Sequence, residues 1–208
     1  MSLVVRIYYD FASPFCYVAR AVLARLSAAH DLRLEWQPFE VIEYLPPQGA
    51  MPQNPAFVRR AEAREIARLE GEYGLRIGLR ERLLNSNLAL CAVEHARAVE
   101  AAAGPIGLAD AVHGSLFEAF YRDDRDIGAS PVVLEVARSA GLDDGLAGAL
   151  EDGRYRVAVA RSRKEAEDLG VVAVPTFLAA GYGVVGIPAY SAFEGLVRQA
   201  TNGPGAVR

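Results

Sequence analysis

The sequence predicts an α/β fold in which a long, all-helical segment interrupts a small sheet. A strand–helix–strand pattern opens the chain, and two short strands followed by a helix close it. The residues between these two ends are mostly helix-prone. Because a strand, a helix and a second strand in succession usually form a parallel crossover, the opening pattern places its two strands in one sheet.

Each element of the opening unit has its own signal in the sequence. A near-continuous β-prone run over residues 3–10 is typical of a buried strand. A helix is predicted from Pro14, which lacks an N–H and is tolerated in a first turn, and apolar residues then recur at helical spacing from Val18 to Leu26. After a turn, alternating apolar and polar residues predict a second strand that ends at Pro38.

The middle of the chain is predicted to be helical. Prolines between Glu40 and Pro55 indicate an irregular connection, and the segments that follow are rich in helix formers bounded by Ser, Asn, Gly and Pro. Ser86 or Asn87 is the expected cap of one helix, and Ser130 is the expected cap of another. The predicted helices cover residues 56–73, 86–103, 108–123, 130–141 and 145–169.

The closing unit begins with two short apolar runs, 175–181 and 182–186, which predict strands joined by a tight turn around Gly181 to Gly183. A last helix follows in "SAFEGLVRQA". The predicted domain organisation is therefore a discontinuous α/β domain, residues 1–50 and 170–208, and a helical insertion domain, residues 51–169.

Composition limits the class of protein. Of the 208 residues, 52% are apolar, which favours a globular fold. The formal charge of −4 offers no excess of cations for phosphates, so a nucleic-acid partner is not expected. No apolar run is long enough to span a bilayer, and the N-terminus lacks the pattern of a secretory signal. We therefore expect a cytoplasmic protein with no membrane partner.

Two motifs carry a resemblance to a known family. The turn Ser13-Pro14-Phe15-Cys16 follows the first strand, and Val174-Pro175-Thr176 precedes the third. Together with "NSNLAL" and "FEAFYRDD", they make nearly the whole chain resemble the DsbA superfamily. This resemblance implies a thioredoxin fold, βαβ…ββα, with a helical insertion. "DFASPF" also resembles the 2-hydroxychromene-2-carboxylate isomerases and kappa-class glutathione transferases, which carry a serine where the oxidoreductases carry their attacking cysteine.

Ser13 is the first candidate catalytic residue. A helix N-terminus presents unpaired N–H groups and a positive dipole end, which favour an anion. A serine hydroxyl does not ionise there, but it can donate a hydrogen bond to the thiolate of a bound thiol and lower the pKa of that thiol. The resemblance implies this role for Ser13, with glutathione or another low-molecular-weight thiol as the cofactor. The alternative is an ordinary N-cap serine.

Cys16 is the second candidate. A dithiol cycle needs two sulfurs within bonding reach, and this motif has one. Cys16 is therefore either a monothiol redox residue or a small buried apolar residue. Asp10, just before the turn, is either a buried acid that affects protonation at the site or a turn residue.

The expected ligand-binding residues are drawn from the same motifs. In thioredoxin folds the bond before the proline of the "VPT" motif is usually cis, which would expose the Val174 backbone to a peptide-like ligand. The alternative is an ordinary trans proline that starts a strand. Asn54 is a looser match to an asparagine of the kappa-class relatives, whereas the acid that holds a γ-glutamyl amine in those relatives has no counterpart among residues 188–191. The expected thiol-binding residues are Ser13, Pro14, Phe15, Asn54, Val174 and Pro175, with no metal.

These expectations leave three classes of function open. The first is an enzyme that uses a bound thiol to isomerise or transfer a small-molecule substrate, for which an aromatic or polyketide-like compound is one candidate. The second is a monothiol–disulfide oxidoreductase that works through Cys16. The third is a non-catalytic peptide-binding module. A homodimer is also an expectation, because two-fold dimers are common.

Overall fold

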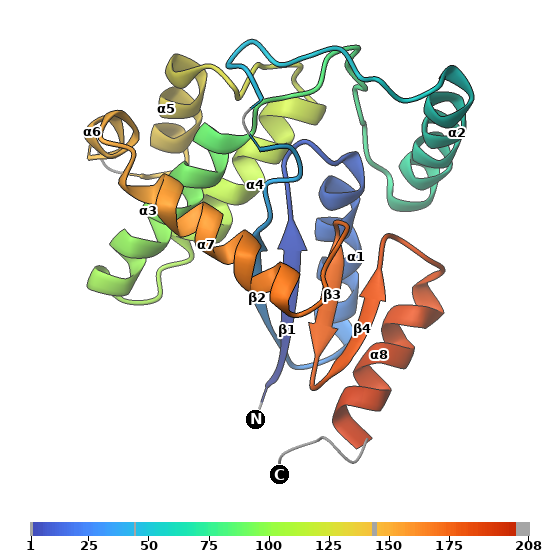
Figure 1. The fold of residues 1–208 in the computed structure, drawn as a ribbon. Coiled ribbons are helices and arrows are strands. Elements are labelled where there is room, and N and C mark those ends of the chain that lie inside the picture. Colours follow the sequence, from blue (N-terminus) through green and yellow to red (C-terminus); the bar gives the residue numbers. More distant parts are fainter. Residues whose placement is uncertain (1, 44, 143–144, 203–208) are drawn as a thin grey trace.

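The computed structural model describes residues 2–43, 45–142 and 145–202. A single four-stranded sheet has the order β2-β1-β3-β4 (Figure 1). β1 pairs in parallel with β2 and antiparallel with β3, and β3 pairs antiparallel with β4. The predicted opening and closing units are therefore confirmed, and both contribute strands to one sheet. The strands are β1 (Leu3–Tyr9), β2 (Leu32–Pro38), β3 (Thr176–Ala179) and β4 (Tyr182–Val185).

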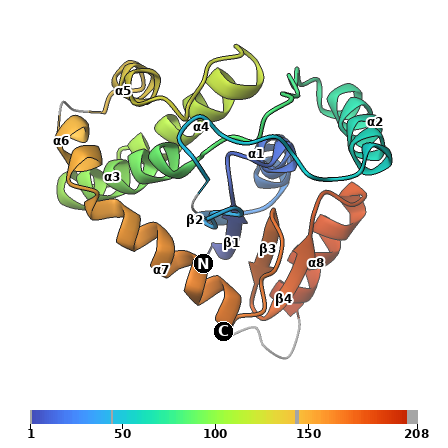
Figure 2. The same ribbon diagram turned by 45° about the horizontal axis from the view of Figure 1, so that its top comes forward.

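Helices cover both faces of the sheet. α1 (Pro14–Ala29) and α8 (Tyr190–Asn202) lie on one side, and α7 (Arg154–Asp168) lies on the other (Figure 2). Because side chains alternate along β1, Ile7 and Tyr9 enter the main core, whereas Tyr8 joins a small cluster whose other buried members are Phe39, Ala166 and Val171. The end of α7 is thus held against the sheet.

The remaining helices, like α7, lie between β2 and β3 in the chain. α3 packs on α4, α5, α6 and α7, whereas α2 packs on α1 and lies to one side in Figure 1. Among the described residues, no helix has both the length and the apolar character needed to cross a bilayer. The division into two domains stays a prediction. The helices are α2 (Ala56–Tyr73), α3 (Asn87–Ala103), α4 (Leu108–Tyr121), α5 (Ser130–Ser139) and α6 (Leu146–Glu151).

Three local predictions were wrong. The single helix expected over 145–169 is two helices, because the chain between α6 and α7 passes through Gly153 at φ 66°, a left-handed conformation that glycine adopts readily. Ser130 is the first helical residue and Ala129 occupies the cap position. The turn between β3 and β4 consists of Ala180 and Gly181, both at positive φ, so it is a two-residue hairpin loop one position earlier than expected.

An aromatic cluster joins the insertion to the sheet beside the first turn. The rings of Phe11 and Phe117 lie 4.5 Å apart, and those of Tyr9 and His113 lie 4.4 Å apart in an edge-to-face arrangement. The Tyr121 hydroxyl, which is buried, donates a hydrogen bond to the Phe11 carbonyl at 2.9 Å. α4 therefore fixes the backbone that leads into α1.

Candidate functional site

Asp10 organises the turn between β1 and α1. Its side chain is buried, and its two carboxylate oxygens accept hydrogen bonds from the Ala12 N–H at 3.0 Å and the Val41 N–H at 2.7 Å. Burial raises the pKa of Asp10, and hydrogen bonds from Ala12, Ser86 and Val41 oppose that shift. Asp10 thus ties the turn to the segment after β2 and to the start of α3.

Ser13 stands at the N-terminus of α1. It occupies the cap position with an extended backbone, φ −98° and ψ 115°, yet its side chain makes no capping hydrogen bond. Pro14 occupies the first turn, where no N–H is needed. The hydroxyl of Ser13 is therefore not committed to the helix end, although the residue has the position of a cap.

Cys16 lies one turn further along α1 and is sealed in the core. Its exposed fraction is 0%, and burial raises the pKa of its thiol to about 12, against the opposing effect of hydrogen bonds to the Asp10 backbone and the Ser13 side chain. A thiol with this pKa is almost entirely protonated near neutral pH, and the thiolate is the nucleophilic form. The surroundings of Cys16 thus match those of a structural cysteine.

Ser13 opens onto a cleft of about 500 Å³. The cleft lies between the first turn of α1, the helices α2 and α7, and the loop that leads into β3. Its apolar wall comes mostly from Phe39, Val41 and the valines of the loop, and its charged wall consists of Glu62, Arg163 and Glu167. The full lining is Ala12, Ser13, Pro14, Phe39, Val41, Glu62, Arg163, Glu167, Val171, Val172, Ala173 and Val174.

Three of the predicted site residues meet in this cleft, namely Ser13, Pro14 and Val174. The Val174–Pro175 peptide bond is cis. Within the described part of the chain, the N–H and C=O of Val174 form no backbone hydrogen bond, whereas the Pro175 carbonyl accepts one from the Gly186 N–H at 2.8 Å. The backbone of Val174 is thus available to a ligand beside Ser13.

The other predicted residues lie outside the cleft. Phe15 is partly buried against the main core. Pro175 is buried and is not part of the lining. Asn54 lines a neighbouring hollow of about 610 Å³, which shares Pro14 and Glu62 with the cleft. A ligand that reaches Asn54 would therefore have to extend beyond the Ser13 cleft.

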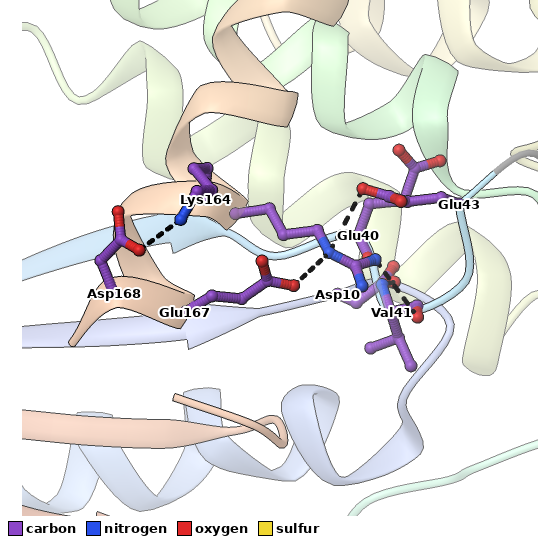
Figure 3. A network of polar contacts seen from close by, with 8 residues as sticks. Asp10, Glu40, Val41, Glu43, Lys164, Glu167 and Asp168 are labelled. Atoms are coloured by element: carbon purple, nitrogen blue, oxygen red, sulfur yellow. Dashed lines mark hydrogen bonds and ion pairs between the residues drawn. The ribbon is translucent and has the colours of Figure 1, made fainter. Parts of the chain in front are cut away.

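Arg163 is surrounded by acids on the wall of the cleft. Its guanidinium forms ion pairs with Glu43 at 3.3 Å and Glu167 at 3.0 Å, and it also donates a hydrogen bond to the Glu40 carbonyl. Figure 3 shows these carboxylates and Asp10 converging from the segment after β2, from α7 and from the first turn. The charge of Arg163 is thus already balanced by protein carboxylates.

Glu40 contributes a further acid to this network. Its Oε2 accepts a hydrogen bond from the Asn87 side-chain amide at 3.0 Å. Burial raises the pKa of Glu40, with the hydrogen bond from Asn87 acting in the opposite direction. Glu40 faces a separate hollow of about 410 Å³ that is also lined by Asn87 and Arg156.

Sequence reasoning missed the charged wall. Glu62 and Arg163 lie on helices with many other charged residues, and no local spacing distinguishes them from side chains that face solvent. Asp10 was considered, and its position directly before the turn was the available signal. The sequence held no comparable signal for Glu62.

Comparison with known proteins assigns this fold to a family. Residues 4–198 match the family model of the DSBA-like thioredoxin domain. The chain belongs to this family. The DSBA-like chain is 26% identical over 196 residues to the uncharacterized protein YwbO of Bacillus subtilis (strain 168), a match that covers 93% of this chain and 95% of the relative.

Solved structures show the same DSBA-like thioredoxin fold. A probable DsbA oxidoreductase from Streptomyces coelicolor superposes with a TM-score of 0.83 at 22% identity, over 99% of this chain and 93% of that one. A 2-hydroxychromene-2-carboxylate isomerase superposes with a TM-score of 0.75 at 19% identity, over 96% and 98% of the two chains. Since oxidoreductase and isomerase share this fold, the fold does not choose between the two activities.

Proposed function

We propose that this DSBA-like protein binds a low-molecular-weight thiol, glutathione or an analogue, at Ser13 and uses the bound thiolate for isomerisation or transfer. The arrangement of Ser13 and Cys16 carries the proposal. Ser13 lines the cleft at the start of α1 without capping the helix, whereas Cys16 is buried with a raised thiol pKa. The nucleophilic sulfur would therefore come from the ligand.

The chemistry follows from the helix terminus. The positive end of the α1 dipole and the Ser13 hydroxyl would stabilise a thiolate, so the bound thiol would release its proton to solvent near neutral pH. The thiolate would then add to an electrophilic carbon of a conjugated double bond, forming a carbon–sulfur bond. Rotation and expulsion of the thiolate would give the isomer and regenerate the cofactor, whereas protonation of the adduct would give a transferred thioether.

The cleft offers surfaces for both reactants. The Val174 backbone can pair with a peptide-like thiol, as a strand edge would, and Asn54 can contact a ligand that extends into the neighbouring hollow. Phe15 and Pro175, which do not line the cleft, would support the site through their packing in the protein interior. The apolar wall would hold a small aromatic substrate next to the thiolate.

Related structures support the choice of thiol and compartment. The cytosolic disulfide reductase DsbM of Pseudomonas aeruginosa, whose structure with GSH has been solved, shares the fold with a TM-score of 0.63 at 23% identity, over 94% and 100% of the two chains. Glutathione is characteristic of reducing compartments. We therefore infer a cytoplasmic location, in line with a chemistry that needs no disulfide.

Thermal unfolding in the presence of thiols tests the proposal. Glutathione, mycothiol or bacillithiol in excess of its Kd should raise the Tm of the wild type, and Ser13→Ala should abolish the shift. Ser27→Ala is the matched control, because Ser27 is exposed at the far end of the same helix. A Tm that responds to none of the three thiols, or a shift that survives in Ser13→Ala, would contradict the proposal.

A second candidate function is a peptide-binding module. Its support is the unpaired backbone of Val174 beside an apolar rim in which Val172 is 88% exposed and Val41 is 42% exposed. Such a module would bind extended apolar peptides irrespective of a thiol group. Peptide arrays scored with Cys-containing and Ser-containing versions of each peptide separate the two functions, because only thiol binding requires the sulfur.

A further inference from the structure

Glu62 is a carboxylate that lines the Ser13 cleft and also a neighbouring hollow that is lined by Arg59, Arg80 and Arg82. It lies on α2 and is half-buried, and the neighbouring hollow is the one that contains Asn54. Within the described ranges, the Glu62 carboxylate forms no ion pair and no hydrogen bond. On the opposite wall, Arg163 is already paired with Glu43 and Glu167. Glu62 is therefore a carboxylate on the cleft wall that has no ion-pair partner within the described residues.

This charge opposes the anion preference of the helix terminus. The start of α1 favours a thiolate at Ser13, but a free carboxylate on the facing wall disfavours a second anion in the same cleft. In a half-buried cleft such repulsion is screened less than on an open surface. A ligand that brings a positive charge to Glu62 removes the conflict, because its ammonium pairs with the carboxylate while its sulfur ionises at Ser13.

We propose that Glu62 selects thiols that carry an ammonium group. This inference rests on the proposed binding of a thiol at Ser13. The thiolate would lie at the N-terminus of α1, and the ammonium would pair with Glu62 across the cleft. A zwitterionic aminothiol or thiol peptide fits this site, whereas a thiol without an ammonium group leaves Glu62 unpaired.

The location of Glu62 supports a role in recognition. α2 packs on α1, so the wall that carries Glu62 is attached to the same helix that carries Ser13. The neighbouring Glu65 on α2 differs, because its carboxylate is paired with Arg68 at 2.7 Å and is not part of the lining. Two glutamates one turn apart on one helix thus have different surroundings.

Binding of two matched pairs of thiols tests the proposal. Glutathione is compared with N-acetylglutathione, and cysteamine with 2-mercaptoethanol, by isothermal titration calorimetry. In at least one pair the ammonium thiol should bind the wild type roughly fivefold to tenfold more tightly, as expected for one charge-assisted hydrogen bond in a half-buried cleft. Glu62→Gln should reduce that preference to within about twofold, and Glu65→Gln should keep it.

The outcomes separate this inference from the function on which it depends. If none of the four thiols binds the wild type, both thiol binding and the role of Glu62 are wrong. If thiols bind and Ser13→Ala abolishes binding, but neither pair shows an ammonium preference, only the role of Glu62 is wrong. The same holds if the preference survives in Glu62→Gln. The ultraviolet absorbance of the bound thiolate gives a second readout. In the wild type this absorbance should be higher with the ammonium thiol than with its matched partner, and Glu62→Gln should show no such difference.

Discussion

Ser13 and Cys16 are joined by a hydrogen bond of 3.0 Å from the Cys16 amide to the Ser13 carbonyl, yet the cleft is lined by Ser13 and not by Cys16. The first turn of α1 therefore separates two kinds of chemistry. Ser13 lines the cleft at the positive end of the helix, and the Cys16 sulfur is buried in the core.

Cys16 should be inert in the folded protein. In a Cys91→Ala background, which removes the other thiol, alkylation of Cys16 by iodoacetamide should be slow and should show no inflection between roughly pH 6 and 9, because burial raises its thiol pKa to about 12. In denaturant, the alkylation rate of the same protein should depend on pH as it does for an ordinary thiol. Rapid native alkylation with a midpoint below about pH 8 would instead favour the monothiol oxidoreductase.

The stability of the Glu40→Gln variant relative to that of the wild type should increase as the pH rises. Burial raises the pKa of Glu40 above its ordinary 4.5, so the folded state binds this proton more tightly than the unfolded state does. The contribution of Glu40 to stability is therefore fully present below the unfolded pKa and is lost as the pH rises through the folded pKa. Glutamine keeps an oxygen for the Asn87 amide and does not titrate.

Thermal unfolding measured from acidic to neutral pH checks the prediction for Glu40. The Tm difference between Glu40→Gln and wild type should increase from acidic toward neutral pH, and Glu151→Gln, at an exposed position on α6, serves as the control. A difference that stays constant with pH would show that Glu40 does not titrate differently in the folded state.

Arg163→Met should destabilise the fold by about 1–3 kcal/mol, because it leaves the Glu40 carbonyl without its donor and the Glu43 and Glu167 carboxylates without their shared cation. Methionine keeps an apolar stem but also removes the guanidinium, whose carbon lies 5.3 Å from the centre of the Phe39 ring. Arg161→Met, on the same helix and paired with Glu165 at 3.8 Å on the surface, should stay within about 0.5 kcal/mol of wild type. Chemical denaturation measures both, and equal losses would mean that Arg163 is an ordinary surface residue.

Gly153→Ala and Gly148→Ala should shift stability in opposite directions. Gly153 has φ 66° at the break between α6 and α7, so alanine there should cost about 1–2 kcal/mol. Gly148 lies inside α6 with open space where the methyl group of an alanine would lie, so alanine there should stabilise by about 0.5–1 kcal/mol. A loss at both positions in urea denaturation would contradict the assigned break.

The α/β class, the order of the elements and the turn that carries Ser13 could all be predicted from the amino-acid sequence. Those features are local, since strand alternation, helical spacing and a proline after a serine are all readable within a few residues. The break at Gly153 was missed because helix-prone residues flank it on both sides, and one glycine within such a run is compatible with a continuous helix.

The surroundings of Ser13 could not be predicted in this way, because they depend on tertiary packing. The burial of Cys16, and the meeting of Glu62 with Arg163 across one cleft, depend on how α1, α2 and α7 pack, and no interval along the chain encodes that packing. A carboxylate on an exposed helix and one on a cleft wall have the same local sequence signature. Their free energies differ because the charges and the solvent around them differ, and those are set by residues distant in the chain.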